Sequence, residues 1–272
     1  MRRPSGPGAS RSAAVAGLLF ALLACTLALP ARATDMAQTA RLMVTSGLLA
    51  DAERPHRLFV EELTRLDVPE DVDPLISLSI RSTFPAAQIR QRWLRELALR
   101  LDDEALAEAR EFFGSIPGQT FGAAMRQSRR TLANARMSPI EPSPTIAAAV
   151  ALLDADAREQ ILQGYSRGFA LWVARLIAGE TDADGLEAAF DDALKGLPPT
   201  RRHVEALALA SLPDLYLLGL MEYAESAPGQ RFFAACTQAL DEAMRQMMYA
   251  QLGHFMESVV RRTGPAESLE TP

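Results

Sequence analysis

The 272-residue sequence predicts an all-α protein, a multi-helix bundle built from two similar helical units. Three observations support this prediction. Apolar residues recur at three- and four-residue spacing along most of the chain, as they do on one face of a helix. No run of alternating β-branched residues appears, so a β-sheet is not expected. One segment also occurs twice, which indicates an internal duplication.

The repeated segment covers residues 111–121 and 222–232, at a constant offset of 111 positions. In each copy an apolar helical pattern ends at an aromatic residue, and Ser-x-Pro-Gly-Gln then begins a second helix. Ser115 and Ser226 are suited to cap that helix, and proline is tolerated in its first turn. Each unit is therefore expected to contain a helix, a tight corner and another helix. The repeated Gly118 and Gly229 predict that another helix or the preceding turn lies close to the backbone there.

Residues 1–33 have the features of a cleaved signal peptide. Three arginines precede an apolar run at residues 13–29, and Ala31-Arg32-Ala33 forms an Ala-x-Ala cleavage site. We expect a periplasmic mature chain that begins at Thr34.

The two cysteines raise a second possibility for maturation. Leu22-Leu23-Ala24-Cys25 resembles a lipobox, so a lipoprotein anchored at Cys25 is the minor alternative. Cys236 would be the single cysteine of the mature chain, which excludes an intrachain disulfide. Its apolar helical setting favours a small buried residue over a reactive thiol.

The charge balance argues against nucleic acid as a partner. The chain has 28 basic and 34 acidic residues, and the leader contains four arginines and no acid, so 24 basic residues would remain. An acidic chain gains nothing from a phosphate backbone. No later stretch approaches the ~20 apolar residues of a membrane span, so none is expected in the mature chain.

The helices can be placed in order. Segments at about 35–46, 54–66, 74–84 and 86–101 precede the first repeat, which completes a first unit at residues 34–137. Residues 138–144 contain three prolines and are expected to form a linker. The second unit, residues 145–262, has helices at about 145–153, 155–178, 181–194 and 199–210 before the repeat, and a last helix from Gly229 to about Arg262. Residues 263–272 are expected to be a disordered tail.

The repeated corner resembles one in the exported bacterial family called domain of unknown function 2059. The resemblance rests, besides the leader and the helical pattern, on these positions: Phe112, Pro117, Gly118 and Phe121; Tyr223, Pro228, Gly229 and Phe232. The first copy departs from an aromatic-Tyr start because it has Phe112-Phe113. The resemblance implies an exported helical domain without an assigned reaction, so it identifies no functional residue.

Gly164-Tyr165-Ser166-Arg167-Gly168 matches the Gly-x-Ser-x-Gly pattern of a nucleophile elbow. That elbow requires a strand that turns sharply into a helix and exposes the serine. Here the preceding residues 158–163 are helical and no βαβ pattern surrounds them. The pattern therefore favours two glycines that ease the packing of a neighbouring helix, and we predict no catalytic residue. A serine hydrolase using Ser166 remains the alternative.

Metal and cofactor sites are not expected. The chain has three histidines, and two of them form pairs at helical spacing, Glu53 with His56 and His254 with Glu257, while His203 has no such partner. Two side chains are too few to hold zinc or iron. Three pairs of carboxylates are neighbours in the sequence, and solvated helix faces and N-caps explain them. The pairs are Glu61-Glu62, Asp102-Asp103 and Asp191-Asp192.

A methionine cluster is interpreted as a buried seam between helices. Met244, Met247, Met248 and Met256 share a stripe with Leu240 and Leu252, which favours the seam over an adaptable binding surface.

Two functional classes follow. The first is a non-catalytic periplasmic binding or interaction protein, whose paired helical units form a groove for a peptide, a lipid or an envelope protein. The second is the hydrolase using Ser166. The duplication favours the first class, and the scarcity of histidine counts against the second.

Overall fold

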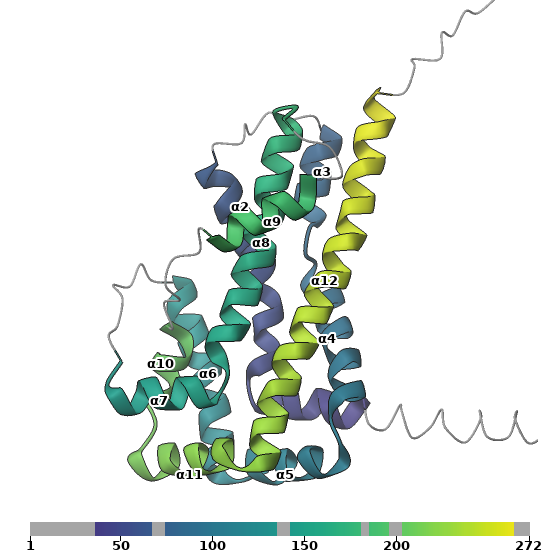
Figure 1. Ribbon diagram of the computed structural model, residues 1–272. Helices are drawn as coiled ribbons and strands as arrows, with labels where there is room; N and C mark the ends of the chain where they lie inside the picture. Colours follow the sequence, from purple (N-terminus) through teal and green to yellow (C-terminus); the bar gives the residue numbers. More distant parts are fainter. Residues whose placement is uncertain (1–35, 67–73, 135–141, 181–184, 196–202, 264–272) are drawn as a thin grey trace, which may run out of the picture.

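The computed structural model describes residues 36–66, 74–134, 142–180, 185–195 and 203–263 (Figure 1). The described part of the structure is 89% helical and contains no strand, which confirms the predicted all-α class. After a helix at residues 36–45, the elements are η1 (Leu48–Glu53), α2 (Arg54–Arg65), α3 (Pro74–Ser82), α4 (Ala86–Arg100), α5 (Asp103–Gly114), α6 (Ile116–Asn134), α7 (Pro144–Leu152), α8 (Ala155–Ile177), α9 (Leu186–Lys195), α10 (His203–Ala210), α11 (Asp214–Glu225) and α12 (Ala227–Thr263).

Helix α12 packs against helices of both predicted units. It is the longest helix, and it contacts α3, α4, α5, α8 and α11 along its length (Figure 1). Its fully buried positions include Cys236, Leu240, Met244 and Met247, which recur at the three- and four-residue spacing of one helical face. The predicted methionine seam is thus confirmed for this stretch.

The two predicted units share one hydrophobic core. Helix α2 packs on α8, α4 on α12 and α6 on α10, and each of these contacts joins the first unit to the second. Trp93 of α4 is fully buried, and its indole N–H donates to the Cys236 carbonyl at 2.9 Å. The rings of Phe59 and Phe84 likewise contact Phe169. The proposed boundaries at 34–137 and 145–262 therefore do not separate two cores.

The two corners have the same hydrogen bonds. In each, the serine hydroxyl donates to the carbonyl of the aromatic residue three positions earlier and accepts the N–H of the glycine three positions later: Phe112, Ser115 and Gly118; Tyr223, Ser226 and Gly229. Equivalent residues also meet, because the rings of Phe112 and Tyr223 stack with centroids 4.3 Å apart. Helix α5 packs on α12 while α11 packs on α6, a reciprocal arrangement typical of a pseudo-twofold axis. The duplication itself stays a prediction.

Several predicted boundaries need correction. Helix α3 ends at Ser82 rather than at Phe84, because Phe84 adopts a left-handed conformation with φ of 53° while its ring is fully buried. Helix α7 begins at Pro144, the last residue of the expected linker, since proline suits the first turn and Ser143 caps it. Helix α12 begins at Ala227, two residues before the expected start.

Three predictions lie outside the described residues. They are the signal peptide at 1–33 with its cleavage site, most of the linker at 138–144, and the tail beyond Thr263.

Candidate binding cleft

A cleft lies between α8, α9 and α12, with α8 as its floor. Its volume is about 450 Å³, which falls within the usual range of small-molecule sites. The residues that line it come from one stripe of each helix: Ala157, Gln160, Ile161, Gly164 and Tyr165; Phe190 and Leu194; Asp241, Arg245, Met248 and Tyr249. Most of this surface is apolar, and a few polar groups lie at the α12 side. Leu194 and Tyr249 are each 53% exposed, so the cleft presents large apolar side chains to solvent.

Two glycines of α8 set the position of α9. A Cβ atom at Gly168 would lie 2.9 Å from the ring of Phe190, and one at Gly164 would lie 3.0 Å from Leu194. Any side chain at Gly168 would therefore push α9 away. This confirms the interpretation of the Gly-x-Ser-x-Gly pattern as a packing surface. Because α9 lies so close to α8, Phe190 and Leu194 form one wall of the cleft.

Tyr165 joins the apolar and polar parts of the cleft. Its ring contacts Phe190 edge-on, with centroids 5.4 Å apart, and its hydroxyl donates to Asp241 Oδ1 at 3.0 Å. Burial and then the Asp241 carboxylate raise the pKa of Tyr165, so the phenol stays protonated. The hydrogen bond fixes the ring as a rigid wall between α8 and α12.

The rim of the cleft has one cation that is already paired. The Arg245 guanidinium on α12 donates to Glu242, one turn earlier, and Glu242 also accepts from Gln246 at 2.7 Å. Asp241 holds Tyr165 through one oxygen only. The two acids and one base on this turn leave an excess of negative charge at the mouth.

Ser166 lies in the middle of α8 and is fully buried. Its hydroxyl donates to the Pro55 carbonyl of α2 at 3.1 Å. An acyl-transfer nucleophile needs exposure, a nearby base and free backbone donors, whereas helical amides are already bonded four residues back. The geometry therefore gives no support to the hydrolase alternative.

The histidines do not converge. His56 Nδ1 donates to the Thr83 carbonyl at 2.8 Å, while Glu53 pairs with Arg90 at 2.9 Å instead of facing the imidazole. His254 and Glu257 lie on the exposed side of α12, and His203 begins α10. Within the described ranges, no group of three or more His, Cys, Asp or Glu side chains could hold a metal ion.

The carboxylate pairs have different roles. Asp102 caps α5 by accepting the Ala105 N–H at 2.7 Å, as predicted. Asp192 pairs with Arg175 at 2.8 Å. Glu62 departs from the expected solvated face, because it is buried and pairs with two arginines, Arg65 at 3.0 Å and Arg167 at 3.1 Å.

Cys236 is a free, fully buried thiol in the core. Burial raises its pKa to about 12, so it stays protonated at neutral pH and lacks the thiolate that reacts. The predicted small buried residue is confirmed.

A buried network of charges joins five elements beside the core. Arg54 donates two hydrogen bonds to Glu159, at 2.5 and 2.6 Å, and Arg129 pairs with Asp51 at 2.6 Å. Glu205 of α10 is only 6% exposed. Burial and then the negative charge of Asp51 raise its pKa, although three arginines oppose this shift.

Arg158 adds a further buried cation to this network, and its charge acts on Glu205. It is 2% exposed, and its Nη1 donates to the Leu153 carbonyl at 2.6 Å, but Nε and Nη2 meet no acceptor among the residues that the structure describes. Such a group is costly to bury. Because the network joins η1, α2, α6, α8 and α10, we assign it to the relative placement of these elements.

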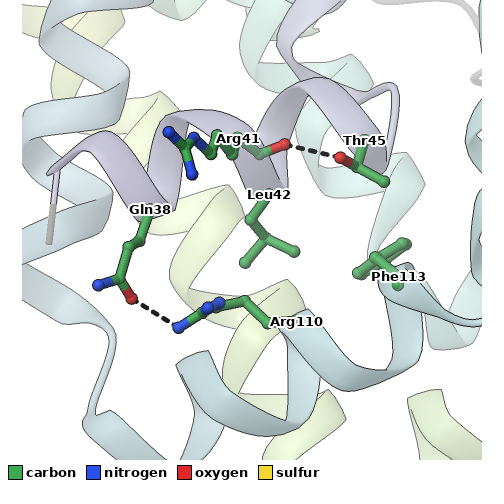
Figure 2. A pocket seen from close by; sticks show the side chains of 7 residues that line it. Gln38, Arg41, Leu42, Thr45, Arg110 and Phe113 are labelled. Atoms are coloured by element: carbon green, nitrogen blue, oxygen red, sulfur yellow. Dashed lines mark hydrogen bonds between the residues drawn. The ribbon is translucent and has the colours of Figure 1, made fainter.

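A smaller hollow of about 170 Å³ lies between helix 36–45 and α5 (Figure 2). Arg110 points to Gln38 and donates to it at 2.6 Å, whereas the Arg41 guanidinium lies apart from both. Because the two arginines do not converge, they form no anion clamp. The hollow is a poorer candidate than the α8–α9–α12 cleft.

No helix in the described ranges combines the length and apolar character needed to cross a membrane. Comparisons of the chain with protein-family models, with curated proteins and with solved structures find no match in any of the three. The resemblance of the corners to domain of unknown function 2059 therefore stays a prediction.

The sequence did not identify the cleft residues. Tyr165 was visible as part of the Gly-x-Ser-x-Gly pattern, but its pairing with Asp241 spans 76 positions. Phe190 and Tyr249 also lie on separate helices. The available signal was the spacing of Gly164 and Gly168, which marks where a neighbouring helix approaches α8.

Proposed function

We propose that this protein is a non-catalytic, exported binding protein whose ligand is a small apolar molecule or acyl chain held between α8, α9 and α12. The observation that carries the proposal is the 450 Å³ cleft, which is walled by aromatic and aliphatic side chains. Burial of apolar surface supplies the main driving force in such sites, and a few polar groups orient the ligand.

A neutral fluorescent probe tests this proposal. N-phenyl-1-naphthylamine emits strongly in apolar surroundings, and we expect saturable binding to the native protein. Ala157→Trp, which places a large ring on the cleft floor, should weaken that binding at least about tenfold, because the ring occupies the ligand's volume. Leu218→Trp is the matched control, since Leu218 is 60% exposed on α11 and does not line the cleft. Equal binding by all three proteins would refute the assignment to this cleft.

Native mass spectrometry of protein purified from the periplasm complements the probe by detecting a ligand that co-purifies. The hydrolase alternative has its own test, incubation with a fluorophosphonate. We expect no covalent label, because Ser166 is buried within α8. Labelling that disappears in Ser166→Ala would instead favour the hydrolase.

A further inference from the structure

The inference rests on the proposed function and concerns the charge of the ligand. The cleft contains three aromatic rings, Tyr165, Phe190 and Tyr249, each from a different helix. Aromatic rings carry negative charge on their faces and attract organic cations, and cages of this kind recognise alkylated ammonium groups. The steep angle between Tyr165 and Phe190, 64°, sets two walls of such a cage.

A carboxylate lies beside these rings. Asp241 accepts the Tyr165 hydroxyl through Oδ1, and no hydrogen bond from the described residues to Oδ2 is found. The nearby Arg245 interacts with Asp241, but its guanidinium also donates to Glu242, so this turn keeps two acids for one base. A cation in the cleft would therefore meet aromatic faces and a net excess of negative charge together, whereas both would disfavour an anion.

We propose that the α8–α9–α12 cleft selects an organic cation, an alkylated ammonium group attached to an apolar body. The ammonium group lies near Asp241 and Tyr249 at the mouth, where it stays partly hydrated. The apolar body lies against Ile161, Phe190 and Met248, which contribute no charge. Selectivity comes from the aromatic walls and Asp241, and the general affinity comes from the apolar floor.

Calorimetric titration with three eight-carbon probes separates these contributions. Octyltrimethylammonium, 1-octanol and octanoate share the same chain and differ in the charge of the head. We expect the cation to bind at least about tenfold more tightly than 1-octanol. This difference in affinity is the size expected for a partly desolvated cation–π contact together with one carboxylate. Octanoate should bind most weakly.

Two variants locate the selectivity. Asp241→Asn and Tyr249→Leu should each lower the affinity for octyltrimethylammonium about threefold to tenfold and leave that for 1-octanol within twofold. Asp103→Asn, on α5 and outside the cleft, is the control for the general negative charge of the protein, and it should change neither affinity.

The outcomes distinguish the two proposals. If 1-octanol binds in the cleft but the cation binds no more tightly, the cation inference is wrong and the proposed function stands. If the preference persists in both cleft variants, or disappears in Asp103→Asn, the cation is recognised elsewhere and the inference is also wrong. If none of the probes binds, the proposed function itself fails.

Discussion

At the scale of single residues, Gly118 and Gly229 determine how closely the two helices of each corner approach. A Cβ atom at Gly118 would lie 2.6 Å from the Phe113 Cα and closer still to the Phe112 carbonyl oxygen. At Gly229 it would lie 2.8 Å from the Tyr223 carbonyl carbon and closer still to the oxygen. These neighbours are backbone atoms, which cannot rotate away. The preceding turn therefore approaches the new helix so closely that only hydrogen fits.

We accordingly predict that Gly118→Ala and Gly229→Ala each destabilise the protein by about 1–3 kcal/mol, because the added methyl group overpacks the corner. Gly219→Ala is the control. Gly219 is also helical, but nothing lies within 4 Å of its Cβ position, so alanine should stabilise by about 0.5–1 kcal/mol through helix propensity. The urea midpoints of the variants show whether each change stabilises or destabilises the protein. Stabilisation by alanine at either corner would contradict the proposed close packing.

At the scale of elements, the position of α9 depends on Gly168 of α8, where the absence of a side chain lets the Phe190 ring pack closely. Gly168→Ala should destabilise the protein by about 1–3 kcal/mol, since the methyl group meets the Phe190 ring. Combining it with Phe190→Ala should show a coupling of about 0.5–3 kcal/mol, because the second change removes the obstructed ring. Urea unfolding of the single and double variants measures this coupling, with Gly253→Ala as the unobstructed control. Strictly additive effects would mean that α9 is not held by this contact.

The buried charge network gives a second prediction about elements, on pH. The folded state raises the pKa of Glu205 above its ordinary value of 4.5. Such a group is neutral at low pH, and its contribution to stability is lost as pH rises through the raised pKa. We expect Glu205→Gln to be more stable than the unchanged protein at pH 7, by about 1–3 kcal/mol, because glutamine has no charge to desolvate in this buried position.

The difference should shrink as pH falls toward 4.5, because Glu205 then becomes protonated and resembles glutamine. Thermal or urea unfolding between pH 4.5 and 8 measures this difference in stability between the variant and the unchanged protein. Glu187→Gln makes the same chemical change at an exposed site on α9 and should leave the profile unchanged. If Glu205→Gln is less stable at pH 7, the carboxylate is ionised and paired with an arginine, contrary to this prediction.

At the scale of the whole molecule, the prediction concerns maturation. We expect the exported chain to begin at Thr34, because Ala31-Arg32-Ala33 is the better-formed processing site. Intact-mass measurement of the exported protein checks this. Cys25→Ser should leave the mass unchanged, whereas Ala33→Lys should retain the uncleaved leader. A diacylglycerol-modified Cys25 at the N-terminus would establish the lipoprotein alternative instead.

The sequence alone determined the features that depend on neighbours along the chain. Helical periodicity predicted the all-α class and placed α2, α4 and α8 within a residue or two, because a helix is built from contacts three and four positions apart. Composition and spacing also predicted the buried Cys236 and the approach of a helix at Gly164 and Gly168. Local signals failed at Phe84, where burial of the ring stabilises a backbone conformation that propensity disfavours.

Only the tertiary structure decided which distant residues meet. Nothing local pairs Tyr165 with Asp241, places Arg54 against Glu159, or closes two units around one core. These contacts depend on how α8, α9 and α12 cross, and crossing is set by the packing of whole helical surfaces rather than by short patterns. The cleft therefore appears in the fold and in no single segment of the chain, because its walls belong to three helices that the sequence keeps apart.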